Sequence, residues 1–369
     1  MEESNSMRSV RCIAIFSVVV ISILLYPLEG AVAQTARSSG DNAGYENWNL
    51  VWEYAPDHPV KKISASPDGS YVAVVCDNWD WEYSQNESLC LLTNNGNLVW
   101  KNDSYSIFGK YNWIHDVSVS EEATYMAVGS EDETYLLHRN GSIAWKKQIE
   151  GRNLASISSD GNCVAVGTCL EQLNFLGKDG QGLWNFSAQE SVMSVAVSVD
   201  GQYVAAGDSG GNVYLLDNQG NLLWNRRLNN GFAYVAVSFN GEFVGAAANG
   251  KIGILNRSGN WTLNPTDIHH QVTSVSITMD GNLLFVAGED GGLGIYDGNG
   301  ESVGSFETGE RVVDVDSTPD GAHVVVGSDS CVYSLERVVV PEFPRLTVMS
   351  FFMIATLLVT IVCRRRHGF

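Results

Sequence analysis

Short runs of alternating apolar and polar residues cover the middle of the chain. They are rich in Val, Tyr and Trp and are separated by Gly, Asp and Asn, a pattern typical of short strands joined by tight turns. The clearest stretch is "VMSVAVSVDGQYVAAGDSGGNVYLLDNQGNLLWNRR" (192–227), which predicts four successive antiparallel strands. Helical periodicity is scarce, so the middle of the chain is expected to be all-β.

A turn of the Asp-Gly type recurs at a fixed interval. "SSDG", "SVDG", "SFNG", "TMDG" and "TPDG" place residues 160, 200, 240, 280 and 320 at one turn position, 40 residues apart. The copy "SPDG" (66–69) and the degenerate copy "SEEA" (120–123) extend the series to seven units, with extra residues in the first interval. A repeated four-stranded unit of this length predicts a seven-bladed β-propeller of antiparallel blades.

The repeats resemble two propeller families. "SPDGSYVAV" and its copies are similar to WD repeats, and the ending "G-N-L-x-W" is similar to the PQQ-like repeats of quinoprotein-type propellers. The resemblance covers residues 49–338 and implies the fold, but no particular activity, because propellers include catalysts and scaffolds alike. The tryptophan of the ending is shifted to Trp261 in the fifth unit and absent from "ESVGSF" (301–306); elsewhere it is Trp52, Trp100, Trp145, Trp184 and Trp224.

One strand stands outside the repeat series. "NLVWEY" (49–54) reads as a fourth strand without the three that should precede it. The last unit, conversely, ends after three strands with "CVYSLERV" (331–338). We predict that these two segments pair, which would complete the last blade and close the ring without an open sheet edge.

Two apolar segments flank the repeats. Arg8 and Arg11 precede "CIAIFSVVVISILLY" (12–26), and "AVA" (31–33) follows, so residues 1–33 are interpreted as a signal peptide and 34–48 as a linker. The alternative is an uncleaved anchor. The uncharged residues 346–363 predict a C-terminal transmembrane helix, and the basic residues within 364–369 predict a cytoplasmic tail. The repeats are therefore expected at the cell surface.

The segment before the predicted membrane span carries a second motif. "VPEFP" (340–344), the apolar span and the basic end together resemble the PEF-type sorting signals of archaeal surface proteins, with 339–345 as the motif. The resemblance implies that a membrane sortase cuts the chain there and transfers it to another anchor. The alternative is a single-pass membrane protein that keeps its C-terminal anchor.

The formal charge of −20 argues against a nucleic-acid partner, whose phosphates require a basic surface. In a propeller, the loops between second and third strands share one face with the connections between blades, and several acidic residues fall there. They predict an acidic rim that would attract cations or a basic partner, or else simply solvated turn residues. The rim residues are Asp77, Asp80, Glu131, Asp132, Asp208, Glu289, Asp290 and Asp329.

The extra residues of the first interval form two long loops on that same face, 77–88 and 102–113. Aromatic side chains on a rigid scaffold predict a contact surface for a protein or glycan partner. The alternative is that the rings are buried against each other as a cap. They are Trp79, Trp81, Tyr83, Tyr105, Phe108, Tyr111 and Trp113.

Covalent and catalytic features are few. Cys76 and Cys90 flank the first loop and are candidates for a disulfide across a hairpin. The adjacent His115 and Asp116 should point to opposite sides of a strand, so no catalytic dyad is expected, and no zinc-type cysteine pairs occur. Glycosylation is predicted at the sequons of Asn86, Asn102, Asn140, Asn185, Asn256 and Asn260.

These observations favour an exported propeller that acts as a binding or scaffolding module for a protein or glycan at the cell envelope. We expect neither enzymatic activity nor a cofactor or metal. One alternative is a secreted enzyme or cofactor-binding propeller of the quinoprotein type. Another is a purely structural component of the cell envelope.

Overall fold

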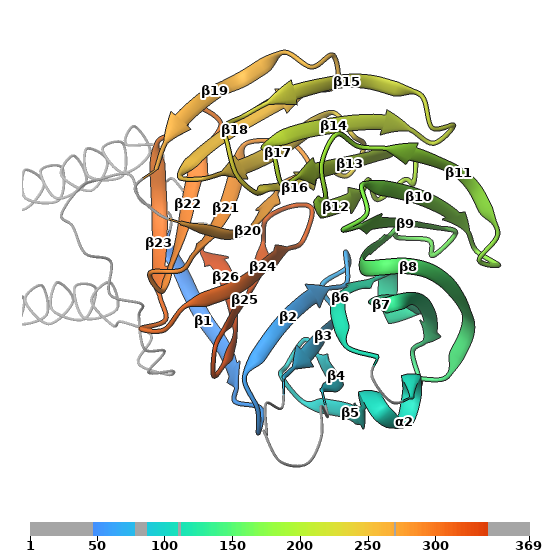
Figure 1. Ribbon diagram of the computed structural model, residues 1–369. Helices are drawn as coiled ribbons and strands as arrows, with labels where there is room; N and C mark the ends of the chain where they lie inside the picture. Colours follow the sequence, from blue (N-terminus) through green and yellow to red (C-terminus); the bar gives the residue numbers. More distant parts are fainter. Residues whose placement is uncertain (1–46, 78–86, 110–111, 269–270, 339–369) are drawn as a thin grey trace, which may run out of the picture.

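The computed structural model describes residues 47–77, 87–109, 112–268 and 271–338. Antiparallel sheets surround a centre like the blades of a propeller, and each sheet runs outward from an inner strand (Figure 1). The prediction of an all-β propeller with antiparallel blades is therefore confirmed. Apart from a short helix, α2 (Ser104–Phe108), and a single turn of 3-10 helix (Glu121–Ala123), the described elements are strands.

The strands form six sheets, and in the four-stranded ones the order of strands runs from the inner strand outward. The first has β2 (Val60–Ala65), β3 (Tyr71–Cys76), β4 (Ser88–Thr93) and β5 (Leu98–Asp103). The second has β6 (Ile114–Val119), β7 (Tyr125–His138), β8 (Ile143–Ile157), β9 (Cys163–Thr168), β10 (Gln172–Gly177) and β11 (Gly182–Ser187). The third has β12 (Val192–Val197), β13 (Tyr203–Asp208), β14 (Asn212–Asp217) and β15 (Leu222–Arg227).

The remaining three sheets follow the same plan. The fourth has β16 (Ala233–Val237), β17 (Phe243–Ala248), β18 (Lys251–Asn256) and β19 (Trp261–Asp267). The fifth has β20 (Val272–Ile277), β21 (Leu283–Gly288), β22 (Gly292–Asp297) and β23 (Ser302–Glu307). The last has β24 (Val312–Ser317), β25 (His323–Ser328), β26 (Val332–Val338) and β1 (Asn47–Tyr54).

The number of sheets corrects the prediction of seven blades: the described strands form six, one of them six-stranded. The cause lies in β8, which passes from one repeat unit into the next without a break. The part of β7 before Glu131 pairs with β6, and the part after it pairs with β8. The far end of β8, Asn153–Ile157, then pairs with β9. Two repeat units are thereby joined in a single sheet.

The closure of the ring by the N-terminal strand is confirmed. β1 pairs with β26 in antiparallel register, with Leu50 opposite Leu335 and Asn47 opposite Val338. The strand begins two residues earlier than "NLVWEY", and the added residue Trp48 is buried. Its indole lies edge-on to Phe285 with ring centroids 5.6 Å apart. The chain start is thus part of the core as well as the sheet edge.

The propeller has two faces, which differ in the connections they carry. The turn face carries the Asp-Gly turns between first and second strands, and the loop face carries the loops between second and third strands and between blades. Both ends of the described propeller lie at the turn face, because Asn47 is opposite Val338 and the backbone N–H of Arg337 donates to the carbonyl of Ala322 in an Asp-Gly turn, at 2.9 Å.

The repeated tryptophan connects its strand to the following repeat. Trp224 shows the arrangement: its Nε1 donates to the carbonyl oxygen of Arg257 at 2.9 Å, in the turn after β18. A Cβ built on Gly259 in that turn would lie 2.7 Å from Cγ of Trp224, and the φ of Gly259 is +75°. The "G-N-L-x-W" ending therefore supplies both the donor and, one repeat later, the glycine against which the ring packs. The equivalent donors are Trp52, Trp100, Trp145 and Trp184.

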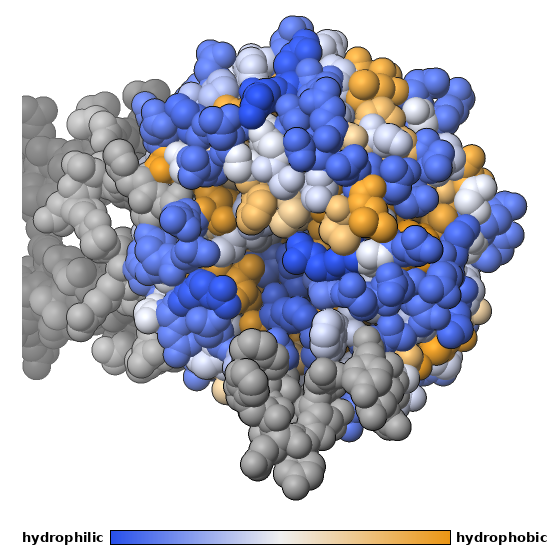
Figure 2. Space-filling model, in the orientation of Figure 1, coloured by the Kyte–Doolittle hydropathy of each residue, from blue (hydrophilic) through white to orange (hydrophobic). Residues whose placement is uncertain are grey.

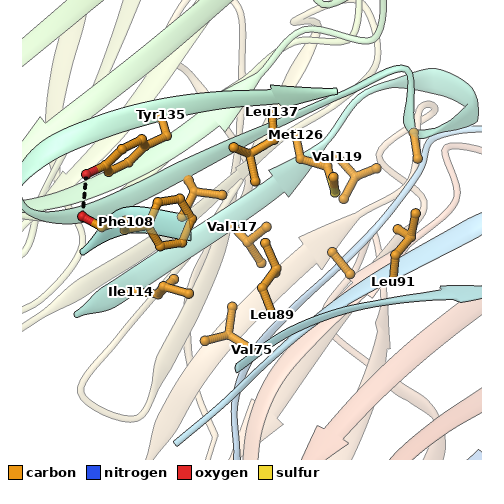
Figure 3. Close-up of a cluster of buried hydrophobic side chains, with 13 residues drawn as sticks. Val75, Leu89, Leu91, Phe108, Ile114, Val117, Val119, Met126, Tyr135 and Leu137 are labelled. Carbon is orange, nitrogen blue, oxygen red and sulfur yellow. Dashed lines mark hydrogen bonds between the residues drawn. The ribbon is translucent and has the colours of Figure 1, made fainter. Parts of the chain in front are cut away.

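Apolar side chains fill the space between neighbouring sheets. One cluster lies between the first and second sheets and includes Leu89, Val117 and Met126 (Figure 3). Helix α2 carries Phe108 into this cluster, where it packs on Tyr135 with ring centroids 4.4 Å apart. Burial of these side chains stabilises the contact by about 1.5–3 kcal/mol each.

Several predictions fall outside the described residues. These are the signal peptide and most of the linker at the start, and the PEF-type motif, transmembrane helix and tail at the end. Within the part of the chain that the structure describes, no helix has both the length and the apolar character needed to span a bilayer.

Candidate functional site

A cavity of about 640 Å³ occupies the centre of the propeller, where the inner strands meet. It is lined by β2, β6, β12, β16, β20 and β24 and by the inner end of β8. These strands surround the centre in Figure 1, and Figure 2 shows hydrophobic and hydrophilic residues side by side around the hollow in this face. The volume lies within the range of small-molecule sites, roughly 300–1,000 Å³.

The side chains that enter the cavity follow from the repeat. The residues four positions before the Ser or Thr of each Asp-Gly turn lie at one level of the cavity. They form a ring of charged, hydroxyl-bearing and apolar side chains. Charge is concentrated in three neighbouring members, and the others are apolar or hydroxyl-bearing. In chain order the ring consists of Lys62, Asp116, Leu154, Ser194, Tyr234, Ser274 and Asp314.

The three charged members interact. Lys62 Nζ lies 3.5 Å from Oδ2 of Asp314, and both side chains are largely buried. Burial alone would lower the pKa of Lys62, but the charges of Asp314 and Asp116 outweigh it and raise the pKa. Burial raises the pKa of Asp116 to about 6; Lys62 opposes this shift and Asp314 adds to it. One lysine therefore faces two carboxylates, and this side of the cavity carries excess negative charge.

The same carboxylates join neighbouring blades. Oδ2 of Asp116 accepts from the backbone N–H of Ala155 at 3.1 Å, and Oδ2 of Asp314 accepts from that of Ile63 at 3.1 Å. Asp316 does the same for Ala65 at 2.9 Å, and burial raises its pKa to about 6. Serines replace the aspartates at other blade contacts, as in the bond from Val197 N to Ser156 Oγ. Structural bridging is thus the first role of these carboxylates.

Several residues of the predicted acidic rim have partners. Glu131 accepts from or pairs with Nε2 of His115 at 2.8 Å, and Asp329 binds the guanidinium of Arg311 at 2.9 Å. Asp132 caps the backbone N–H of Gly151 at 2.7 Å. Among the other rim residues, Asp77 and Glu289 line the cavity, Asp290 lies in the turn after β21, and Asp80 is outside the described residues.

Asp208 does not belong to the rim. It is fully buried, and its Oδ2 accepts from the hydroxyl of Tyr214 and from Nδ2 of Asn212, both at 2.8 Å. Its other oxygen accepts from the backbone N–H groups of Gly210 and Asn212. The residue therefore organises the loop between β13 and β14, and the prediction that it faces solvent is wrong.

The aromatic loop residues divide into three groups. Trp113 is 39 % exposed, as a contact residue should be. Phe108 is buried in the core, so its predicted place on a contact surface is wrong; helix α2 turns it inward. Trp79, Trp81, Tyr83, Tyr111 and the side chain of Tyr105 lie outside what the structure describes, and their role stays a prediction.

Cys76 and Cys90 come together without forming the predicted disulfide. Both thiols are free and buried, and they hydrogen-bond to each other. The register explains the difference: Cys76 is opposite Ser88 and Cys90 is opposite Val74, so the cysteines are diagonal neighbours. Diagonal Cα atoms lie about 7–8 Å apart, beyond the usual reach of a disulfide. That bond with Cys90 and burial raise the pKa of Cys76.

The sequons differ in exposure. Asn140, Asn185 and Asn260 are exposed, whereas Asn102 and Asn256 are half-buried, and Asn86 lies outside the described residues. Oδ1 of Asn256 accepts from the backbone N–H of Ser258 and of Asn260, each at 3.0 Å. Glycosylation of the exposed sites remains a prediction.

Sequence reasoning missed the charged wall of the cavity. Lys62, Asp314 and Asp316 are unusual because they interrupt the apolar first strands "VKKISA" and "VVDVDS", and this interruption was the available signal. His115 and Asp116 do point to different partners, Glu131 and Ala155. In the described part of the chain, His, Cys, Asp and Glu side chains nowhere gather in a group that could hold a metal ion.

Comparison with known proteins agrees with the repeats and the fold. Residues 85–260 match a PQQ-like family model described as outer membrane protein assembly factor BamB. Residues 262–297 match the WD domain, G-beta repeat. No curated protein matches the chain significantly. The two matches and the circular arrangement of antiparallel sheets together support a β-propeller of the PQQ-like and WD-repeat kind.

Proposed function

We propose that the protein is a binding or scaffolding module that engages a protein or glycan partner at the cell envelope through its loop face. The observation that carries the proposal is the position of the chain ends. Asn47 and Val338 both lie at the turn face, so the loop face is opposite both ends of the described propeller. In this proposal the segment 346–363 is an anchor, either retained or exchanged by a membrane sortase.

Exposed apolar side chains give the loop face contact groups. Trp113 precedes β6 and is 39 % exposed, while Leu170 and Phe232, in loops on the same face, are each 52 % exposed. Aromatic side chains supply large contact areas at low conformational entropy, and they dominate the energetics of many interfaces. A propeller with PQQ-like and WD repeats is a suitable rigid support for such groups.

The experiment compares the two faces. The full chain, labelled with a fluorophore, is applied to isolated cell envelopes and to a glycan array, as wild type and as the Trp113→Ala and Phe232→Ala variants. Matched controls are Phe239→Ala and Met279→Ala, which remove exposed apolar side chains from the turn face. We expect loss of binding for the loop-face variants only. Equal binding of all variants, as a purely structural envelope component would show, contradicts the proposal.

The match to a PQQ-like repeat model favours a second candidate, a cofactor-binding propeller of the quinoprotein type. Incubation of the full chain with pyrroloquinoline quinone, followed by gel filtration and an absorption spectrum of the protein peak, tests it. A quinone chromophore that co-elutes with the chain would support this candidate over a binding scaffold.

A further inference from the structure

One cation of the central cavity has no partner among the residues that the structure describes. Arg152 lines the cavity and is half-buried, and its guanidinium makes no hydrogen bond or ion pair with any of the described residues. Each of the other basic side chains in the cavity wall contacts a carboxylate. The pairs are Lys61 with Glu87, Lys62 with Asp314, His115 with Glu131, and Arg311 with Asp329.

The carboxylate of Asp116, in the negatively charged part of the cavity, lies beside the strand that carries Arg152. Oδ2 of Asp116 is 3.1 Å from the backbone nitrogen of Ala155, three residues along β8 from Arg152. Because a strand rises about 3.3 Å per residue, the side chains of Asp116 and Arg152 start several ångströms apart along the direction of the strands. Because Asp116 and Asp314 share a single lysine, Lys62, the wall at this height would stabilise another positive charge.

The opposite wall carries the carboxylate of Glu289 near the loop face, and its deeper residues bear hydroxyl groups. Ser194, Tyr234 and Ser274 stand at the height of Asp116, and of these three hydroxyls only that of Ser194 hydrogen-bonds to a neighbouring strand within the described residues, at Val235. On this side of the cavity the guanidinium of Arg152 lies nearer the loop face, and the carboxylate of Asp116 lies deeper. Asp77, Glu289 and Asp329 line the loop-face end, and hydroxyl groups face Asp116 across the cavity.

We propose that the cavity binds a small zwitterion of the amino-acid type, with its carboxylate on Arg152 and its ammonium group toward Asp116. A guanidinium binds a carboxylate through two parallel N–H···O bonds, which gives this contact both energy and direction. A volume of about 640 Å³ accommodates a free amino acid or a short peptide. The ligand enters from the loop face, since Arg152 is opposite Glu131 of the loop-face rim.

The arrangement selects against ions of a single charge. A simple carboxylate on Arg152 would sit above Asp116, Asp314 and Asp316 without a compensating positive charge. A simple ammonium near Asp116 would gain no contact with Arg152. Only a ligand with both groups satisfies both walls, so the chemistry of the site distinguishes zwitterions from their single-charge analogues.

The test uses a matched series of probes on the purified full chain. L-alanine and glycylglycine carry both charges, propionate keeps only the carboxylate, and ethylamine keeps only the ammonium group. Titration calorimetry should show L-alanine or glycylglycine binding with Kd of about 1 mM or tighter. Propionate and ethylamine should bind at least tenfold more weakly than the better zwitterion.

Variants locate the site. Arg152→Gln and Asp116→Asn should each weaken zwitterion binding at least tenfold, and Arg152→Lys should give an intermediate loss. The matched control is Arg227→Gln, on an outer strand and outside the cavity, where Arg227 binds Asn230. Unchanged circular dichroism of Arg152→Gln establishes that this variant is folded.

Three outcomes would overturn the proposal: neither zwitterion binds at 10 mM (about ten times the expected Kd), propionate or ethylamine binds as tightly, or Arg152→Gln binds like wild type. The result is independent of the envelope-binding experiment, because Trp113 and Phe232 are outside the cavity lining. Failure of one proposal therefore does not decide the other, which is tested by its own measurement.

Discussion

The carboxylate of Asp316 accepts a hydrogen bond from the backbone N–H of Ala65, with 2.9 Å between Oδ2 and N. The two residues are separated by 251 positions in the chain, and the bond connects β24 of the last sheet to β2 of the first. Asp314 makes the parallel contact with Ile63. The ring is therefore closed twice, by strand pairing at its outer edge and by buried carboxylates at its inner edge.

These carboxylates predict how stability depends on pH. Burial raises the pKa of Asp116 and of Asp316 from 3.8 to about 6. The folded state therefore holds these protons more tightly than the unfolded state. Their stabilising contribution is fully present below pH 4 and is lost as the pH rises through 6. Urea unfolding between pH 4.5 and 7.5 should give a free energy that falls with pH by about 1–2 kcal/mol for each group.

Replacement of Asp116 or Asp316 by asparagine distinguishes the pH dependence due to these carboxyl groups from that of other titrating groups. Asp116→Asn and Asp316→Asn should each flatten the decline between pH 5 and 7. Asp280→Asn is the control of opposite sign: burial alone would raise the pKa of Asp280, but hydrogen bonds from Thr278 and Asn282 lower it. Its carboxylate therefore stabilises the fold above pH 4, and that contribution disappears as the pH falls. A steeper decline in Asp116→Asn than in wild type would refute the assignment.

Removal of the closing strand should weaken the whole propeller. Deletion of residues 49–54 exposes the hydrogen-bonding edge of β26 and removes Leu50 and Trp52 from their packing. The loss should amount to several kcal/mol, and in a domain of this size each kcal/mol lowers Tm by about 2–4 °C. Differential scanning calorimetry measures it, with deletion of residues 35–40, upstream of β1, as the control. Equal melting of both deletions would show that the pairing contributes nothing.

The tryptophan contact between repeats can be tested as a pair. Trp224→Ala removes a side chain that is 6 % exposed and should cost about 3–5 kcal/mol. Gly259→Ala places a Cβ against the indole at positive φ and should also destabilise the fold. In the double variant the clash is absent, so the combined loss should be smaller than the sum of the two. If denaturant unfolding gave the double variant a loss of stability equal to the sum of the two single losses, Trp224 and Gly259 would not interact.

Cysteine reactivity should distinguish the free thiols from the predicted disulfide. Cys76 and Cys90 are buried and free, while Cys169 is exposed. A thiol reagent added to the folded chain should label Cys169 rapidly, and it should label Cys76 and Cys90 only after unfolding. Mass spectrometry of the unfolded, unreduced chain measures the outcome. A mass two hydrogens lower, with Cys76 and Cys90 in one cross-linked peptide, would establish the disulfide instead.

Features that repeat in the sequence were predictable. The Asp-Gly turns, the tryptophan ending and the closing role of "NLVWEY" each depend on local chemistry that recurs along the chain, so one unit explains the others. Gly259 illustrates this, since only a residue free to adopt positive φ fits under Trp224. The pairing of β1 with β26 followed from counting strands.

Features that break the repeat were not predictable in the same way. The sheet count changed because β8 runs without a break from its pairing with β7 to its pairing with β9, where other units have a loop between blades. Phe108 was assigned to a contact surface because the helical turn at Ser104–Phe108 was missed. The cavity charges escaped notice because Lys62 and Asp314 come from opposite ends of the chain and meet only when the ring closes.

The pairing of β1 with β26 also determines how the molecule responds to mechanical load. Asn47 and Val338 are opposite each other at one end of the pair, so tension between the two chain ends would separate the strands one hydrogen bond at a time. Tension between Val338 and a partner on the loop face acts differently. It pulls β26 lengthwise between β25 and β1, where the bonds to both neighbours share the load in shear. The pairing of β1 with β26 therefore opens under low force when the two chain ends are pulled apart. It withstands a higher force when Val338 is pulled against a partner on the loop face.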